Sequence, residues 1–212
     1  RGEAISVWQN ATSNVLAAGN SIHSVGANMA MPDQVSSANF SSMGMTGDMR
    51  ISWRVGSDPS TDFSLLGLGE TDTGISAADI KFGFFNILGS AAIIEGGTFV
   101  EYTGVNLAID TKLSLEVIGD TINYYIDDVL VYGTSVAGSV DFNVDAVFMS
   151  ASEMSYVDFR IHALGKTKVN TWVNADVGVS AVLNSIIADE SVVSNAQINS
   201  VHFSALGYTD NY

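Results

Sequence analysis

Acidic side chains gather in two neighbouring loops of the sequence. They are Asp58 and Asp62 in "GSDPSTDF" (56–63), and Glu70, Asp72 and Asp79 in "GETDTGISAAD" (69–79). Calcium takes several hard oxygen ligands from flexible loops, so this set predicts a calcium site. The spacing is not that of an EF-hand loop, and solvated acidic loops are also expected in a chain with 23 Asp and Glu against 8 Lys and Arg residues. The sequence therefore predicts no required cofactor, with calcium as the alternative.

A second group of side chains has the chemistry needed to hold a sugar. Sugar binding needs an exposed aromatic ring and polar groups that fix the hydroxyls of the ligand. Side chains alternate in direction along a strand, so Asn123, Tyr125 and Asp127 are expected on one face. Arg50 and Arg54 share a face of another strand for the same reason. These five residues form the predicted carbohydrate-binding site, and an ordinary structural role for each is the alternative.

The sequence offers no arrangement of residues that is typical of catalysis. Retaining glycoside hydrolysis needs two carboxyl groups about 5–5.5 Å apart, whereas a Gly-Gly turn separates Glu95 from Glu101 and nothing marks them as a pair. His23, His162 and His202 lie in separate segments without a partner motif, which favours solvated or hydrogen-bonded histidines. The sequence therefore predicts no catalytic residue and a protein that is not an enzyme.

The formal net charge of −15 restricts the partners of the chain. It repels the phosphates of nucleic acid and anionic lipids, and no apolar run approaches the ~20 residues needed to span a bilayer. The opening "RGEAISVWQN" has no signal-peptide pattern and indicates a processed form or a fragment. The chain has no cysteine, unlike most small secreted animal domains. We expect no nucleic acid partner, no membrane insertion, and a bacterial surface or virion protein, with a cytosolic protein as the alternative.

Apolar and polar residues alternate over most of the first 165 residues. The stretch "DMRISWRVG" (48–56) places Trp53 on its apolar face, and so in the core. The stretch "KLSLEVIGDTINYYIDDVLVYGTS" (112–135) indicates two strands joined at Gly119 and Asp120, and the start of a third. Further strands are predicted at 63–68, 81–87, 91–95, 98–103, 140–149 and 155–164. Short strands at this spacing predict an all-β, antiparallel two-sheet jelly-roll sandwich.

The end of the chain repeats its beginning. Residues 171–186, "TWVNADVGVSAVLNSI", match residues 7–22, "VWQNATSNVLAAGNSI", after a shift of 164 positions. With one residue dropped, "SVHFSALGYTDN" (200–211) continues the match with "SANFSSMGMTGD" (37–48). Tryptophan and glycine recur in register, which indicates a duplication. The alternative is that short strands with polar turns resemble one another.

The repeat predicts a jelly-roll module over residues 1–165 and an additional C-terminal β segment over residues 166–212. Two or three strands bury too little apolar surface to be stable alone. The segment is therefore expected to pack on its own module or on a neighbouring subunit, or to begin a second module; a strand donated to an open sheet edge is one such arrangement. Four of its residues are predicted to make the assembly contact: Trp172, Asn174, Val179 and Phe203.

Several stretches follow one another in an order that is typical of one fold. They are "VWQNATSNVLAAGNSIHSVG" (7–26), "GDMRISWRV" (47–55), "FSLLGLGETDT" (63–73), "DIKFGFFNI" with "AAIIEGGTFV", the hairpin "KLSLEVIGDTINYYIDDVLVYGTS", and "VDFNVDAVFMSASEMSYVDFRIHALG" (140–165). In this order they resemble the concanavalin A-like lectin and glucanase (laminin-G-like) superfamily, and most closely its versions in bacterial surface proteins and phage fibres. The hairpin carries most of the resemblance, although Asp128 stands where its tight turn usually has Gly.

The resemblance implies a jelly roll of two antiparallel sheets. Many members of the superfamily bind carbohydrate, some cleave it, and many only make protein contacts. Its glucanases carry Glu-x-Asp-x-x-Glu on one strand, and the nearest match here is "ETDTGI" (70–75), with Ile75 at the position of the second Glu. This departure argues against glycosidase activity.

Together these features predict a non-catalytic structural and adhesive module of an extracellular assembly at a cell or virion surface. A phage or virion surface fibre and a bacterial filament or adhesin are the settings that fit. The expected partners are other copies of the chain or neighbouring subunits, and a cell-surface glycan. A discrete carbohydrate-binding lectin domain is the alternative, followed by a glycan hydrolase or lyase.

Overall fold

The computed structural model describes residues 3–26, 32–44, 47–70, 76–136, 141–150 and 153–164, together with the backbone of four short strands between residues 172 and 200. The chain divides into two compact units, which we call unit 1 (Arg1–Leu164) and unit 2 (Gly165–Tyr212). None of the helices in the described part of the chain is long and apolar enough to cross a membrane.

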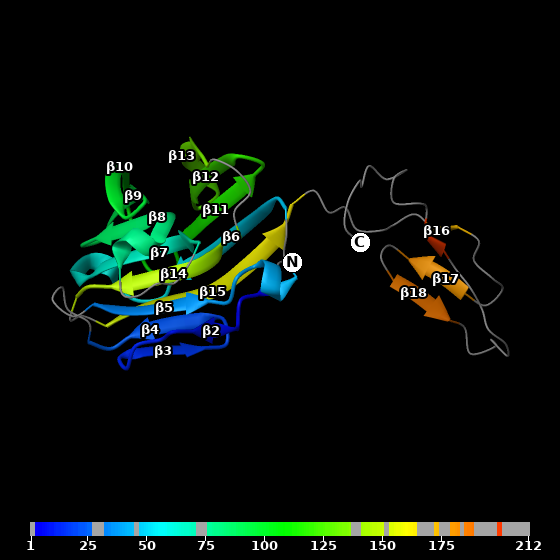
Figure 1. Ribbon diagram of the computed structural model, residues 1–212, viewed down its shortest axis with the longest axis horizontal. Helices are drawn as coiled ribbons and strands as arrows, with labels where there is room; N and C mark the ends of the chain where they lie inside the picture. The colour runs from blue at the N-terminus through cyan, green and yellow to red at the C-terminus, as the bar shows by residue number, and fades with distance from the viewer. Residues whose placement is uncertain are drawn as a thin grey trace. The chain divides into compact units, whose positions relative to one another are not determined.

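Unit 1 is a sandwich of two antiparallel sheets (Figure 1). Sheet A has the strand order β13 (Val129–Ser135), β12 (Thr121–Ile126), β11 (Lys112–Ile118), β6 (Met49–Val55), β15 (Met154–Ala163), β4 (Ser21–Ser24) and β3 (Val15–Ala18), and β1 (Glu3–Ala4) pairs with β15. Sheet B has the order β10 (Thr98–Asn106), β9 (Ser90–Glu95), β8 (Ile80–Ile87), β7 (Phe63–Gly69), β14 (Asn143–Phe148), β5 (Asp33–Ser37) and β2 (Trp8–Gln9). The connections contain the short helices η1 (Ser41–Met43), η2 (Pro59–Thr61) and η3 (Ala77–Asp79).

The core lies between the inner faces of the two sheets, where the alternating pattern of the sequence places its apolar residues. Trp53 on β6 is fully buried, as predicted. Its ring stacks on Phe159 of sheet A with centroids 6.0 Å apart and meets Phe84 of sheet B edge-on at 6.2 Å. This aromatic cluster joins the two layers, so the predicted all-β, antiparallel two-sheet jelly-roll sandwich is confirmed.

The predicted strands agree with the structure to within about three residues at their ends, and the third strand of the 112–135 stretch, β13, is complete. The turn between β12 and β13 explains how the hairpin tolerates Asp128. Asp127 and Asp128 have φ values of 48° and 65°, and two positive φ values in a two-residue loop define a type I′ turn. Aspartate enters this backbone region more readily than most residues, so Gly is not required there.

The outer faces of the two sheets differ in character. On sheet B, Leu65, Ile80, Ile94 and Val147 form a second buried apolar cluster, against which Phe85 packs. On sheet A, the outward positions of β6 and β11 carry charged residues and serines instead. The partly exposed, polar outer face of sheet A is therefore the candidate ligand-binding surface.

Unit 2 contains two pairs of short antiparallel strands, so the additional C-terminal segment is β structure in its described residues. In it β16 (Trp172–Val173) pairs with β19 (Asn199–Ser200), and β17 (Val179–Val182) pairs with β18 (Ser185–Ala188). Two predicted assembly residues, Trp172 and Val179, begin β16 and β17. The other two, Asn174 and Phe203, lie outside the described residues, and the predicted packing of the segment stays a prediction.

Candidate functional site

The register of three neighbouring strands gathers most of the predicted sugar-binding residues on the outer face of sheet A. Glu116 in the middle strand, β11, pairs with Asn123 on β12 and with Arg50 on β6. Ser114, two residues earlier, pairs with Tyr125. The sheet thus brings together residues that are about 70 positions apart in the chain. We use the name sheet A platform for six residues of this face and its adjoining turn: Arg50, Lys112, Glu116, Asn123, Tyr125 and Asp128.

The Tyr125 ring is held in one orientation at the centre of the platform. The Arg50 guanidinium carbon lies 4.3 Å from the ring centroid, within the range of a cation–π contact. The Tyr125 hydroxyl donates a hydrogen bond to Glu116 Oε1 at 2.9 Å, and Asn123 Nδ2 donates to the same oxygen at 3.4 Å. Partial burial and the hydrogen bond to Glu116 raise the pKa of Tyr125, so its hydroxyl is protonated at neutral pH.

Asp128 holds the two cations of the platform in place. Its carboxylate accepts hydrogen bonds from Arg50 Nη2 at 2.6 Å and Lys112 Nζ at 2.8 Å. The hydrogen bond from Lys112 is the main reason that the pKa of Asp128 is lowered. Asp128 is 58% exposed, so such ion pairs add about 0–1 kcal/mol each to stability. Their main effect is to fix the positions of the charged groups around the ring.

The remaining two predicted sugar-binding residues lie in different surroundings. Arg54 shares the outer face with Arg50, as predicted, but its Nη1 donates to the Asp110 carbonyl at 2.7 Å and its Nε lies 4.0 Å from Asp158. Asp127 was predicted on the same strand face as Tyr125, and this is wrong, because β12 ends one residue earlier and Asp127 lies in the turn. There its carboxylate accepts the backbone N–H of Lys112 at 2.9 Å.

Lys112, Glu116 and Asp128 complete the platform and were not predicted. The alternation of "KLSLEVI" already places Lys112 and Glu116 on one face of their strand. What the sequence pattern lacks is the pairing of β11 with both β6 and β12, which sets these charges beside Arg50 and Tyr125. A register between distant strands is decided by the packing of the whole core.

The predicted calcium ligands are dispersed, so far as the structure describes them. Asp58 caps η2 by accepting the Ser60 N–H at 2.9 Å, Glu70 lies 4.0 Å from Lys81, and Asp79 ends η3. Asp72 lies outside the described residues. Within the described ranges, no three His, Cys, Asp or Glu side chains are close enough together to hold a metal.

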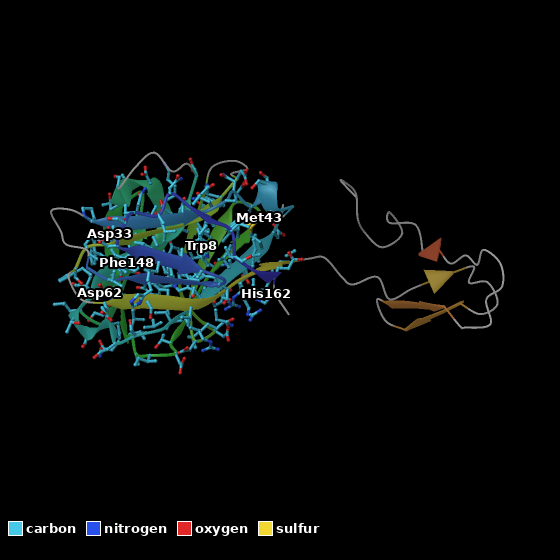
Figure 2. The ribbon with its side chains drawn as sticks, turned by 90° about the horizontal axis from the view of Figure 1, so that it is seen from below. Trp8, Asp33, Met43, Asp62, Phe148 and His162 are labelled. Atoms are coloured by element: carbon cyan, nitrogen blue, oxygen red, sulfur yellow. The ribbon has the colours of Figure 1, made fainter. Side chains whose placement is uncertain are left out.

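Asp62, the fifth predicted calcium ligand, is fully buried rather than part of a solvated loop. Its carboxylate accepts hydrogen bonds from Ser150 Oγ at 2.8 Å and Asn86 Nδ2 at 3.3 Å. Figure 2 shows Asp62 and His162 at opposite ends of the sandwich. Since His162 pairs with Arg50 of the platform, the Asp62 network and the platform are separate sites.

The burial of Asp62 predicts a pH dependence of stability. Burial raises the pKa of this carboxyl above its ordinary value, so the folded state holds the Asp62 proton more tightly than the unfolded state. The contribution of Asp62 to the free energy of unfolding is therefore expected to fall as pH rises from the ordinary carboxyl pKa through the raised value. Urea unfolding at a series of acidic pH values measures this slope, and Asp62→Asn is expected to flatten it. An unchanged slope in the variant would contradict the assignment.

The two histidines in the described part of the chain are not neighbours, because His23 pairs with Ser155 of β15, seven residues before His162. His23 lies on β4 and His162 on β15, while His202 lies outside the described residues. Burial, followed by nearby positive charges, lowers the pKa of His162. It is therefore neutral at neutral pH and adds no charge to the platform.

Comparisons with known proteins support the fold. No family model matches the sequence, and no curated protein matches it. Among solved structures, the chain is similar to the Emp46p carbohydrate recognition domain, with a TM-score of 0.50 and 11% identity over 73% of this chain and 87% of that one. It is also similar to a Trypanosoma rangeli sialidase, with a TM-score of 0.51 and 13% identity over 71% of this chain and 26% of that one. The chain thus spans about a quarter of the sialidase.

These neighbours define a class of fold, a jelly-roll sandwich that also occurs in a carbohydrate recognition domain and in part of a sialidase. The fold agrees with the jelly roll of two antiparallel sheets that the sequence resemblance implied. At 11–13% identity, the likeness concerns the arrangement of strands and not the residues of a site.

Proposed function

We propose that this chain is a non-catalytic glycan-binding module of an extracellular assembly, such as a phage or virion surface fibre or a bacterial filament or adhesin. The observation that carries the proposal is the sheet A platform. There a partly exposed Tyr125 ring is fixed between Arg50 and Glu116, and side chains that can bond to hydroxyls surround it. This combination of an aromatic surface and converging polar groups is what a sugar site needs.

The polar groups of the platform suit a ligand that is rich in hydroxyls. Glu116 and Asp128 are acceptors, while Arg50, Lys112 and the amide of Asn123 are donors. Because these groups are already oriented by one another, a ligand orders few side chains when it binds, which favours affinity.

The electrostatics of the platform favour binding over hydrolysis. Acid catalysis would need a carboxyl group with a raised pKa next to the ligand. The pKa of Asp128 is instead lowered by Lys112, so Asp128 is ionised at neutral pH. A tyrosine nucleophile would have to lose its proton, whereas the pKa of Tyr125 is raised. These directions argue against Asp128 as a general acid and against Tyr125 as a nucleophile.

A discrete lectin domain is the second candidate, and the position of the platform favours it. All six platform residues lie in unit 1, so the proposed site is assembled without a residue of unit 2. Sedimentation over a range of protein concentrations separates the two: a lectin domain stays monomeric, and an assembly module associates.

The test of the proposed function is binding of the full chain to an array of neutral and carboxylated glycans, with and without calcium. Incubation with β-glucans and polyuronates, followed by product analysis, accompanies it. We expect binding to at least one glycan class without calcium, and no cleavage products. Absence of binding to every class, or release of shortened chains, would contradict the proposal.

A further inference from the structure

The strands of unit 2 reproduce the pairing of the first strands of unit 1. In unit 1, β3 pairs with β4 from Val15↔Ser24 to Ala18↔Ser21. In unit 2, β17 pairs with β18 over residues whose numbers are all 164 higher, from Val179↔Ala188 to Val182↔Ser185. The sequence match of 7–22 with 171–186 therefore extends to strand boundaries and register, which the sequence alone does not display.

The second strand pair of unit 2 agrees in the same way. In unit 1, β2 pairs with β5 through Trp8↔Ser37, and in unit 2, β16 pairs with β19 through Trp172↔Ser200. The offset is 164 for the tryptophans and 163 for the serines, as expected from the single residue dropped between the two sequence matches.

In unit 1 these strands form one edge of the sandwich. β4 pairs with β15 of sheet A, and β5 pairs with β14 of sheet B, so strands β2 to β5 close both sheets on the same side. Figure 1 shows β2, β3, β4 and β5 together at the end away from β10 and β13. Trp8 fastens this edge to the core, because its ring meets Phe159 edge-on at 5.0 Å and its Nε1 donates to the Gly19 carbonyl at 2.8 Å.

Unit 2 carries a matching apolar residue wherever the unit 1 edge enters the core. The fully buried apolar side chains of the edge are Ile22, Val35 and Phe40, and Trp8 packs against the same hydrophobic core from the rim. Their sequence counterparts in unit 2 are Ile186, Ile198, Phe203 and Trp172. A segment with this pattern and this register can occupy the same two sheet edges.

One position favours the unit 2 sequence over the resident edge. The Ser24 hydroxyl on β4 is buried and has no hydrogen-bond partner in the described structure, and a buried hydroxyl without a partner is destabilising. The counterpart of Ser24 is Ala188, which has no hydroxyl to satisfy.

From these observations we propose that unit 2 is an exchangeable edge: unit 2 of one copy of this chain binds to β15 and β14 of a second copy, in place of that copy's residues 8–40. Each copy carries both a donor, unit 2, and an acceptor, strands β14 and β15 of unit 1. Copies therefore become linked head to tail. The host must first release its own edge, so exchange is limited by the opening of the β4–β15 and β5–β14 pairings. This inference goes beyond the proposed glycan binding and does not depend on it.

Disulfide trapping in the full chain tests the proposal, since the chain has no cysteine of its own. Ser155 on β15 pairs with His23 on β4, and the counterpart of His23 is Ile187. The variant Ser155→Cys/Ile187→Cys is expected to give disulfide-linked dimers and longer species after mild oxidation, as read on a non-reducing gel. The control variant His23→Cys/Ser155→Cys is expected to form its disulfide within one chain.

Matched substitutions in the two edges are expected to act in opposite directions on the trapped fraction. Ile22→Asp weakens the resident edge and raises the yield of linked dimer several-fold, whereas Ile186→Asp weakens the donor and removes most of the dimer. Ser24→Ala repairs the resident edge and lowers the yield. The proposal is overturned if the 155/187 pair gives no linked dimer while the control pair forms its bond. It is equally overturned if the bond forms only within one chain, or if Ile186→Asp leaves the yield unchanged. No glycan is present, so glycan binding and edge exchange succeed or fail independently.

Discussion

Replacement of Trp53 by Ala is expected to lower the free energy of unfolding by about 3–5 kcal/mol, the range for removal of a buried large aromatic side chain. Trp53 is fully buried and contacts Phe159 in its own sheet and Phe84 in the opposite sheet. Its loss would leave a cavity between the two layers, where both partner rings lose a neighbour. Urea unfolding followed by far-UV circular dichroism measures the change.

Arg54→Ala is the matched control, because Arg54 is the next residue of the same strand but faces outward. Its side chain is 41% exposed, its ion pair with Asp158 is 4.0 Å long, and its hydrogen bond to the Asp110 carbonyl is exposed to solvent. A change of about 0–1 kcal/mol is therefore expected. Equal effects of the two substitutions would show that β6 does not present Trp53 to the core in the way described.

Substitution at the centre of the platform is expected to have the largest effect on function. Arg50→Ala removes both the cation above the Tyr125 ring and a partner of Asp128. A hydrogen bond to a charged group contributes about 1.5–3 kcal/mol, so a roughly 10- to 100-fold weaker glycan affinity is expected. Tyr125→Ala is expected to weaken binding to a similar degree, because it removes the aromatic surface itself. Isothermal titration with a glycan identified on the array measures both.

Two comparisons make this result specific. Tyr125→Phe keeps the ring but loses the hydrogen bond to Glu116, so its affinity is expected to lie between that of the wild type and that of Tyr125→Ala. Lys81→Ala removes a partly exposed cation from β8 of sheet B, and its affinity is expected to be unchanged. Loss of binding in Lys81→Ala with full binding in Arg50→Ala would place the ligand on sheet B and contradict the platform.

The fold was predictable because its main determinant is local. Alternation of apolar and polar residues marks a strand wherever one face is buried, and "DMRISWRVG" and "KLSLEVIGDTINYYIDDVLVYGTS" show it without ambiguity. The same rule placed Trp53 in the core and Arg50 with Arg54 outside. It failed at Asp127, because alternation holds only while the strand continues and a two-residue turn intervenes.

The site was predictable only in part, because its geometry depends on which strands become neighbours. Arg50 and Tyr125 were named separately, but their stacking follows from the position of β11 between β6 and β12. For Asp62, the sequence predicted a position in an acidic loop, whereas the side chain is fully buried. It sits in a polar stretch that reads as a loop, yet Ser150 and Asn86, which surround it, come from distant parts of the chain.

We propose the outer face of sheet A, and not that of sheet B, as the glycan-binding surface. The most direct test is an NMR titration of the isotope-labelled full chain with a glycan identified on the array. Chemical-shift changes are expected in the backbone amides of β6, β11 and β12 and in the side-chain amide of Asn123. Changes concentrated instead in β7, β8 and β14 of sheet B, with the amides of β6, β11 and β12 unmoved at saturation, would contradict the account.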